Sequence, residues 1–395
     1  MRGPVSRRAD RASASPTLAI SSQAKALAGR FNDVISLAAG EPDTPTPRHI
    51  VEAGVDALHQ GATRYLPVAG LPALRRAIAD QSGELRGWRP DATGEVLVTC
   101  GAKHALFHCF QVLLEPGDKV LLSDPAWVSY GPQIRLADGE PVVVPSTVAD
   151  GFYPSVEALE AAYDDRCRAL VINSPNNPTG LMARPDQVEA ITRWAARRKV
   201  WLISDEIYSR ISFSDAPQAL SPVQVKGADI ERILVVDGVS KAYAMTGWRV
   251  GWVMGPKSVV SAASRMQSHQ TSSATSVSQY AALAALDGPQ NCVDELVALL
   301  EKRRDLVMAA ADRLEQVDVL RPQGAFYAFL DLRAALRTGE DDNAFCRELL
   351  DREHLALVPG SAFGAPGHAR LSMAASEADL TEGFERLARF LAARS

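Results

Sequence analysis

The stretch that decides the fold of this 395-residue chain is Ile233-Leu234-Val235-Val236-Asp237-Gly238-Val239-Ser240-Lys241. It begins as an apolar run of strand length and passes through small residues to a lysine. Similar runs occur on both sides of it, and most are continuously apolar, which is typical of strands buried on both faces of a mostly parallel sheet. The expected strands are Val96–Thr99, Val120–Ser123, Pro141–Val144, Ala169–Asn173, Val200–Ser204, Ile233–Asp237 and Val250–Met254. Helical stretches alternate with them, so the sequence predicts an α/β fold with a seven-stranded sheet.

The two flanks of this region have a different pattern. The expected elements are a helix at Ser22–Arg30, a short strand at Val34–Leu37, a long amphipathic helix at Cys292–Leu314, and strands near Gly324–Leu330 and Leu355–Val358. They predict a smaller α+β domain formed by the N-terminal segment and the C-terminal part. The expected division is a mobile arm at 1–14, an N-terminal part of the small domain at 15–46, a large domain at 47–288, and an interdomain helix with the small domain at 289–395.

Composition limits the class of protein. Hydrophobic residues make up 47% and charged residues 23%, with a formal net charge of -5, which gives no reason to expect binding to nucleic acid or membrane. The five cysteines are odd in number and form no CxxC pair, which favours a reducing, cytoplasmic compartment. The arginine-rich start is compatible with a transit peptide, but a mobile or subunit-crossing arm is the favoured interpretation.

Residues with chemical potential stand at successive strand ends, where open α/β sheets bind their ligands. The backbone of Gly101-Ala102-Lys103 can offer N–H groups to an anion, and Trp127 can cover a flat ligand. Asn177 lies in a turn, Asp205 supplies a carboxylate and Lys241 an amine. Each of these alone is more often a cap, a turn or a core residue. Their joint occurrence indicates one site.

This set of groups suits an aldehyde cofactor with a pyridine ring. A lysine amine binds an aldehyde as an imine, and a carboxylate beside a pyridine nitrogen keeps that nitrogen protonated. Of the eight lysines, Lys241 is the one at a buried strand end among small neighbours. No metal site is predicted: Cys100, His104 and His108 imitate a metal-binding stripe, but Gly101 lies where strand passes to helix, and ordinary helix packing is favoured.

With these residues in place, the chain resembles the fold type I pyridoxal-phosphate (PLP) enzymes, and within them the class I aminotransferases of the bacterial aspartate aminotransferase branch. The resemblance runs from about residue 15 to the C-terminus. It is carried by Gly40–Asp43, Thr63–Tyr65, Ala69-Gly70, Gly101–Lys103, Trp127–Tyr130, Asn176–Gly180, Ser204–Tyr208, Gly238–Arg249, Gly324–Tyr327 and Pro359–Gly364.

The resemblance implies a role for each site residue. Lys241 would hold PLP covalently and then act as the base that moves the substrate's Cα proton, while Asp205 would pair with the ring nitrogen. Tyr208 and Asn177 would hydrogen-bond the phenolic oxygen, and Trp127 would stack on the ring. The phosphate would be held by Gly101, Ala102, Lys103, Ser240 and Arg249, with Tyr65 reaching in from a partner subunit of a homodimer. The substrate would contact Gly40, Trp127, Asn177, Lys103 and Arg370, whose fork would take the α-carboxylate.

The resemblance also implies a reaction: transfer of an amino group from an L-amino acid to a 2-oxo acid by a ping-pong mechanism. Lys103 either recognises an acidic side chain or faces solvent near the phosphate. Ser13, Ala126, Ser273-Ala274 and Gly131-Pro132 depart from the relatives on the substrate side. The substrate is therefore either of the aspartate/glutamate type or a dedicated biosynthetic amino acid.

Two alternatives remain open. One is a PLP-dependent lyase, decarboxylase or oxidase on the same fold. The other is a non-catalytic PLP-binding regulator, which is disfavoured because no helix-turn-helix pattern or basic face precedes Gly40.

Overall fold

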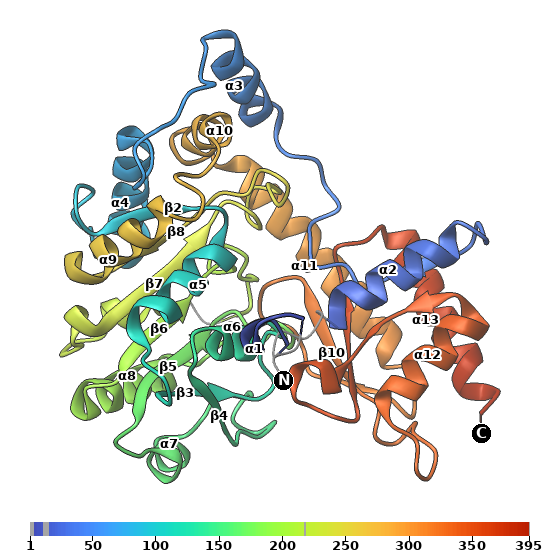
Figure 1. The fold of residues 1–395 in the computed structure, drawn as a ribbon. Helices are drawn as coiled ribbons and strands as arrows, with labels where there is room; N and C mark the ends of the chain where they lie inside the picture. The colour runs from blue at the N-terminus through green and yellow to red at the C-terminus, as the bar shows by residue number, and fades with distance from the viewer. Residues whose placement is uncertain (1–3, 11–15, 217–218, 395) are drawn as a thin grey trace.

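The protein is described here from a computed structural model covering residues 4–10, 16–216 and 219–394. Its large sheet confirms the predicted α/β class and has seven strands in the order β2-β8-β7-β6-β5-β3-β4 (Figure 1). These are β2 (Val96–Thr99), β3 (Lys119–Ser123), β4 (Glu140–Val144), β5 (Cys167–Asn173), β6 (Trp201–Asp205), β7 (Ile233–Gly238) and β8 (Gly251–Met254). All neighbours pair in parallel except β8, which is antiparallel to both β2 and β7.

Helices cover both faces of this sheet. They are α4 (Pro72–Arg86), α5 (Ala102–Leu113), α6 (Tyr130–Leu136), α7 (Val156–Ala162), α8 (Pro185–Arg198), α9 (Lys257–Ser268) and α10 (Ser276–Asp287), with 3-10 turns at Pro222–Gln224 and Ile230–Arg232. Helix α3 (Arg48–His59) packs on α10. Neighbouring residues of β6 point to opposite faces of the sheet. Ile203 packs in the hydrophobic cluster that includes α5 and α9, and Leu202 packs in the cluster that includes α4, α8 and α10. Because both faces are covered, the strands read as continuous apolar runs.

The remaining elements form a second group. They are α2 (Pro16–Ala28), β1 (Ile35–Ser36), α11 (Asn291–Ala311), β9 (Asp318–Val319), β10 (Tyr327–Asp331), α12 (Asp342–Glu353), β11 (Leu355–Ala356), β12 (Val358–Pro359), β13 (His368–Ser372) and α13 (Glu377–Ala392), with a 3-10 turn at Gly360–Phe363. The strand order β12-β13-β10-β9 is antiparallel, and β1 pairs in parallel with β11. The N-terminal segment therefore returns to the C-terminal part, as predicted. Figure 1 shows α11 running between the two groups.

Two details differ from the expectations. The strand expected at Leu355–Val358 is divided, because Leu355–Ala356 pairs with β1 whereas Val358–Pro359 pairs with β13. Helix α2 begins at Pro16, six residues before the expected start; proline is well accepted in a first helical turn. In the expected arm, Arg7–Asp10 is helical, while Ser13 lies outside the described residues. Among the helices described, none is long and apolar enough to cross a membrane.

Candidate active site

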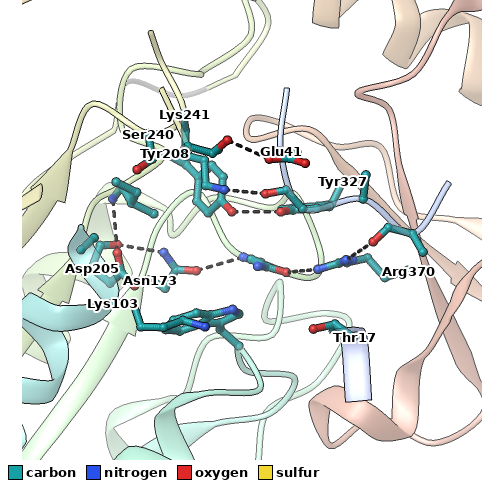
Figure 2. A pocket seen from close by; sticks show the side chains of 18 of the residues that line it. Thr17, Glu41, Lys103, Asn173, Asp205, Tyr208, Ser240, Lys241, Tyr327 and Arg370 are labelled. Atoms are coloured by element: carbon teal, nitrogen blue, oxygen red, sulfur yellow. Dashed lines mark hydrogen bonds between the residues drawn. The ribbon is translucent and has the colours of Figure 1, made fainter. Parts of the chain in front are cut away.

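A cavity of about 660 Å³ lies at the carboxyl ends of the large-sheet strands, where β10, β13 and the N-terminal segment approach them (Figure 2). The structure brings most of the predicted site residues together in its lining: Gly40, Ala102, Lys103, Trp127, Asn177, Asp205, Tyr208, Ser240, Lys241, Arg249 and Arg370. These residues come from segments far apart in the sequence, and the fold brings them to one cavity.

Asp205 lies at the floor of the cavity, at the end of β6. Its backbone pairs in register with Asn173 at the end of β5, and the Asn173 amide donates to the Asp205 carbonyl at 2.9 Å. The carboxylate is 4% exposed and accepts a 2.6 Å hydrogen bond from the Tyr130 hydroxyl. Burial raises the pKa of Asp205 to about 6. A buried carboxylate of this kind is stabilised by a cationic partner, as a protonated ring nitrogen would be.

Lys241 projects its amine toward the N-terminal segment, with Nζ donating to the Gly40 carbonyl at 2.5 Å. Nζ also lies 5.9 Å from the centre of the Tyr208 ring. Burial lowers the pKa of Lys241 to about 8; Arg370 and Arg249 act in the same direction and Glu41 opposes them. A lysine with this pKa has an appreciable neutral fraction near neutral pH, and the neutral amine is the form that attacks an aldehyde.

The part of the cavity between the start of α5 and Arg249 is suited to bind an anion. Gly101, which is not itself in the lining, precedes α5 with φ +86°, and Ala102 and Lys103 bring the first turn of α5 to the lining. The N–H groups of a first helical turn have no partner within the helix and can bind an anion. The Arg249 guanidinium folds over this turn, donating to the carbonyls of Thr246 at 3.0 Å and Cys100 at 3.3 Å. Behind it, a Cβ on Gly251 would lie only 2.3 Å from the backbone nitrogen of Ala102. The close backbone approach and the cation suit a phosphate.

One wall of the cavity is aromatic and carries a second cation. The Trp127 ring meets the Tyr130 ring edge-on, at 5.2 Å between centroids and 80° between planes. Lys103 places Nζ 4.9 Å from the centre of the Trp127 ring, and its side chain is exposed at the lining. Although Lys103 is exposed toward the open cavity, the surrounding protein partly removes water from its ammonium, and this desolvation together with the nearby Arg249 lowers the pKa of Lys103. The Lys103 ammonium is therefore a second cation of the cavity, beside the Trp127 ring.

Arg370 enters the cavity from β13 and is 2% exposed. Its guanidinium donates to Asn177 Oδ1 and to the Ala38 carbonyl, both at 3.0 Å, and lies 4.4 Å from the centre of the Tyr327 ring. Its Nε is buried with no hydrogen-bond partner, and no carboxylate of the described part of the chain pairs with it. Burial lowers the pKa of Arg370. A desolvated guanidinium without an anion is arranged to bind a carboxylate.

Several residues of the site were not assigned a role from the sequence. Tyr130 holds Asp205, and Tyr327 shares a 3.0 Å hydrogen bond between hydroxyls with Tyr208. Asn173 lies at the end of β5, as Asp205 lies at the end of β6, so its position at the carboxyl end of a strand could have marked it as a site residue. Thr17 and Lys25 line the cavity from α2, and nothing in the local sequence marks them.

Two other expectations concern residues outside the lining. Tyr65 does not reach the cavity of its own chain and is 90% exposed. In the stripe considered for a metal, His104 Nδ1 accepts from the Cys100 backbone nitrogen and the His104 ring lies 4.2 Å from the His108 ring. No group of three metal-ligating side chains is found among the described residues.

Taken together, the donor set fits PLP. Lys241 would take the aldehyde, Asp205 the ring nitrogen, Trp127 the ring face, and the first turn of α5 with Arg249 the phosphate.

Comparison with known proteins identifies the family of this chain. Residues 32–387 match the family described as Aminotransferase class I and II. An aspartate aminotransferase of Streptomyces avermitilis is 42% identical over 394 residues, covering 98% of this chain and 96% of the relative. The solved Thermus thermophilus aspartate aminotransferase with maleate superposes with a TM-score of 0.93 at 39% identity, covering 98% and 100% of the two chains. That of Rhizobium meliloti gives 0.94 at 36% identity, covering 99% of each. The chain thus belongs to the class I and II aminotransferases and is a PLP-dependent enzyme.

Proposed function

We propose that this chain is an aspartate-type aminotransferase that exchanges the amino group of an L-dicarboxylic amino acid with a 2-oxo acid. The observation that carries the proposal is that Lys241, Asp205 and Arg370 line one cavity, at positions suited to the aldehyde, the ring nitrogen and the substrate carboxylate. The aspartate aminotransferases of Streptomyces and Thermotoga maritima, each 42% identical, support this substrate class.

PLP, when bound, supplies an electron sink for the electrons released at the substrate's Cα. The protein's own part is to position groups and move protons. The Asp205 carboxylate would keep a proton on the ring nitrogen. The Lys241 amine, freed by the incoming substrate, would take the proton from Cα and return it to the neighbouring carbon of the cofactor. Tyr208 and Asn177 would hydrogen-bond the phenolic oxygen.

The substrate would be held at both ends by cations. Arg370 is buried and already forms two 3.0 Å hydrogen bonds through Nη1 and Nη2, so it is fixed to receive the α-carboxylate. Lys103 lies on the opposite wall above Trp127 and would receive the side-chain carboxylate. An ion pair is stronger where it is buried away from water, so the buried Arg370 should bind a carboxylate more tightly than the exposed Lys103. We therefore assign the α-carboxylate to Arg370.

We further propose a homodimer in which the partner's Tyr65 completes the phosphate site. Tyr65 is 90% exposed here, and Val51, Val55 and Leu58 leave an apolar stripe on α3 at least 37% exposed. The proposed domain boundaries fall after residues 46 and 288, on either side of the large sheet. The five free cysteines favour the cytoplasm.

Two measurements test the proposal. Borohydride reduction of the PLP-loaded enzyme followed by peptide mapping should place the label on Lys241. Single half-reactions with a panel of amino acids should convert the cofactor to its amine form with aspartate and glutamate, releasing the matching 2-oxo acid. A label on another lysine contradicts the site. Failure of both dicarboxylic amino acids while another amino acid reacts contradicts the substrate class alone.

A further inference from the structure

Directly behind Asp205, on the far side of the sheet, lies a buried cluster of charges that does not line the cavity. Arg86, in the last turn of α4, donates from Nε to Glu206 at 2.7 Å and from Nη2 to Asp237 at 2.6 Å. The three residues are 4%, 5% and 5% exposed, respectively. Arg86 therefore ties the end of β6, which carries Asp205, to the end of β7, which leads to Lys241.

The remaining oxygens of the two carboxylates also have donors. Glu206 Oε1 accepts from the hydroxyls of Ser204 at 2.8 Å and Ser221 at 2.6 Å. Asp237 Oδ1 accepts from the Gly238 backbone nitrogen at 2.7 Å. Five donors from different segments thus converge on the two acids. Burial raises the pKa of Asp237, and the charge of Arg86 and the hydrogen bonds from Gly238 and Arg86 oppose that rise.

The cluster carries more negative charge than positive. Two carboxylates face one guanidinium, and Arg86 is the one cationic side chain in salt-bridge contact with either of them among the described residues. Asp205 adds a third carboxylate on the cavity side, adjacent in sequence to Glu206. Burying uncompensated charge is costly. The excess is compensated when a cation is placed against Asp205.

Among the described residues, none of the groups that interact with Asp205 supplies that cation. Its titratable neighbours are Tyr130, Tyr208 and Cys109, and burial raises the pKa of each of them, so all three are neutral at physiological pH. The charges of Asp237 and Glu206 both contribute to the raised pKa of Asp205, after the larger effect of burial. The two acids thus increase the affinity of this point in the cavity for a proton.

We propose that Glu206 and Asp237 are positioning residues of the cofactor site: held by Arg86, they strengthen the negative potential at Asp205 and so keep the cofactor's ring nitrogen protonated and the cofactor bound. The inference rests on the proposed role of Asp205. Neither acid touches the cofactor, and each acts through the field and the backbone at the end of β6.

The test removes one negative charge at a time without leaving an unpaired charge. Glu206→Gln leaves Arg86 with Asp237, and Asp237→Asn leaves it with Glu206, so a one-to-one buried pair remains in both variants. Arg86→Met is avoided because it would leave two buried carboxylates without a cation. The control is Glu340→Gln, because Glu340 and Glu348 both pair with Arg394 away from the cavity. The Arg394 side chain is 3% exposed, that of Glu340 13% and that of Glu348 29%, and Glu348 also pairs with Arg352, so the change removes one acid and leaves Arg394 paired.

Two readouts are compared across the wild type and the three variants. The first is the dissociation constant of PLP from the apoenzyme; the second is the ¹⁵N chemical shift of bound ring-labelled PLP, which reports protonation directly. Loss of one charge should weaken PLP binding about 10-fold in Glu206→Gln and in Asp237→Asn. The ring-nitrogen signal should shift toward the neutral form in both, and the control should match the wild type.

The outcomes separate the inference from the proposed function. If both variants keep the wild-type affinity and nitrogen shift, or change only the melting temperature of the apoenzyme as the control does, the cluster is structural and the inference is wrong. If one variant does not fold, the other still decides. If the wild type itself takes up no PLP at Lys241, the proposed function fails instead.

Discussion

The end of the large sheet and the outer wall of the cavity are built differently. At the end of the large sheet, Asp205 is buried and fixed by Tyr130 and Asn173. Arg370, on β13 of the four-stranded sheet, is also buried and is fixed by two hydrogen bonds. On the outer wall, Lys103 is exposed and held by an aromatic face, and the approaching residues come from the N-terminal segment. Asp205 and Arg370, which would bind the cofactor and the α-carboxylate common to all substrates, are therefore preorganised by hydrogen bonds. Lys103, proposed for the side-chain carboxylate, instead contacts an aromatic ring. Substitutions of the fixed residues should therefore reduce activity more than a substitution of Lys103.

The largest effect is expected at Lys241. Lys241→Ala removes both the covalent anchor and the amine that moves the Cα proton, so kcat should fall about 1,000-fold or more. Half-reaction kinetics with aspartate measure this. Added methylamine should restore part of the rate, because it replaces the missing base. A variant that keeps a tenth of the wild-type kcat would contradict the role assigned to Lys241.

A smaller but still large effect is expected at Arg370. Arg370→Lys keeps the charge but loses the planar fork and leaves Asn177 Oδ1 and the Ala38 carbonyl without their donor. We expect kcat/KM for every amino acid to fall about 100-fold, since the α-carboxylate is common to all. Steady-state kinetics with aspartate and alanine check this. A loss confined to aspartate would reassign Arg370 to the side-chain carboxylate.

The pKa of Lys241 predicts a pH dependence for cofactor capture. The folded apoenzyme holds this pKa at about 8, below its ordinary value of 10.5. The neutral amine is the reactive form, so its fraction rises as the pH passes upward through about 8. The rate of PLP capture should therefore increase about 10-fold between pH 7 and pH 9 and then level off. Stopped-flow absorbance measures this rate. An increase that continues toward pH 10.5 would show that burial does not perturb the amine.

The smallest effect is expected at Lys103. Lys103→Met removes an exposed cation, and such charges contribute little, so kcat/KM for aspartate should fall about fivefold while that for alanine stays within twofold. The ratio of the two substrates is the measurement. A uniform loss for both, accompanied by weaker PLP binding, would place the ammonium at the phosphate and blur the distinction between the two regions.

Much of the chemical region could be predicted from the sequence because of how parallel strands are arranged. Asp205 and Lys241 follow buried apolar runs, and the carboxyl ends of parallel strands meet at one edge. Tyr130 and Tyr327 could not be found in this way. Their hydroxyls reach Asp205 and Tyr208 through packing between segments distant in sequence, 75 and 119 residues apart. The division at Leu357 was missed for a related reason, because an apolar run does not reveal which of two sheets each half joins.

The antiparallel strand β8 has a consequence for how this sequence can vary. Because Gly251 lies directly against the start of α5, a methyl group there would collide with the Ala102 backbone nitrogen rather than with a side chain that could turn aside. Gly251 does not line the cavity, so inspection of the lining residues alone would predict no effect of a substitution there. Saturation mutagenesis of the gene should nevertheless find glycine alone tolerated at this codon, and a library that randomises the second layer of the phosphate site should leave it fixed.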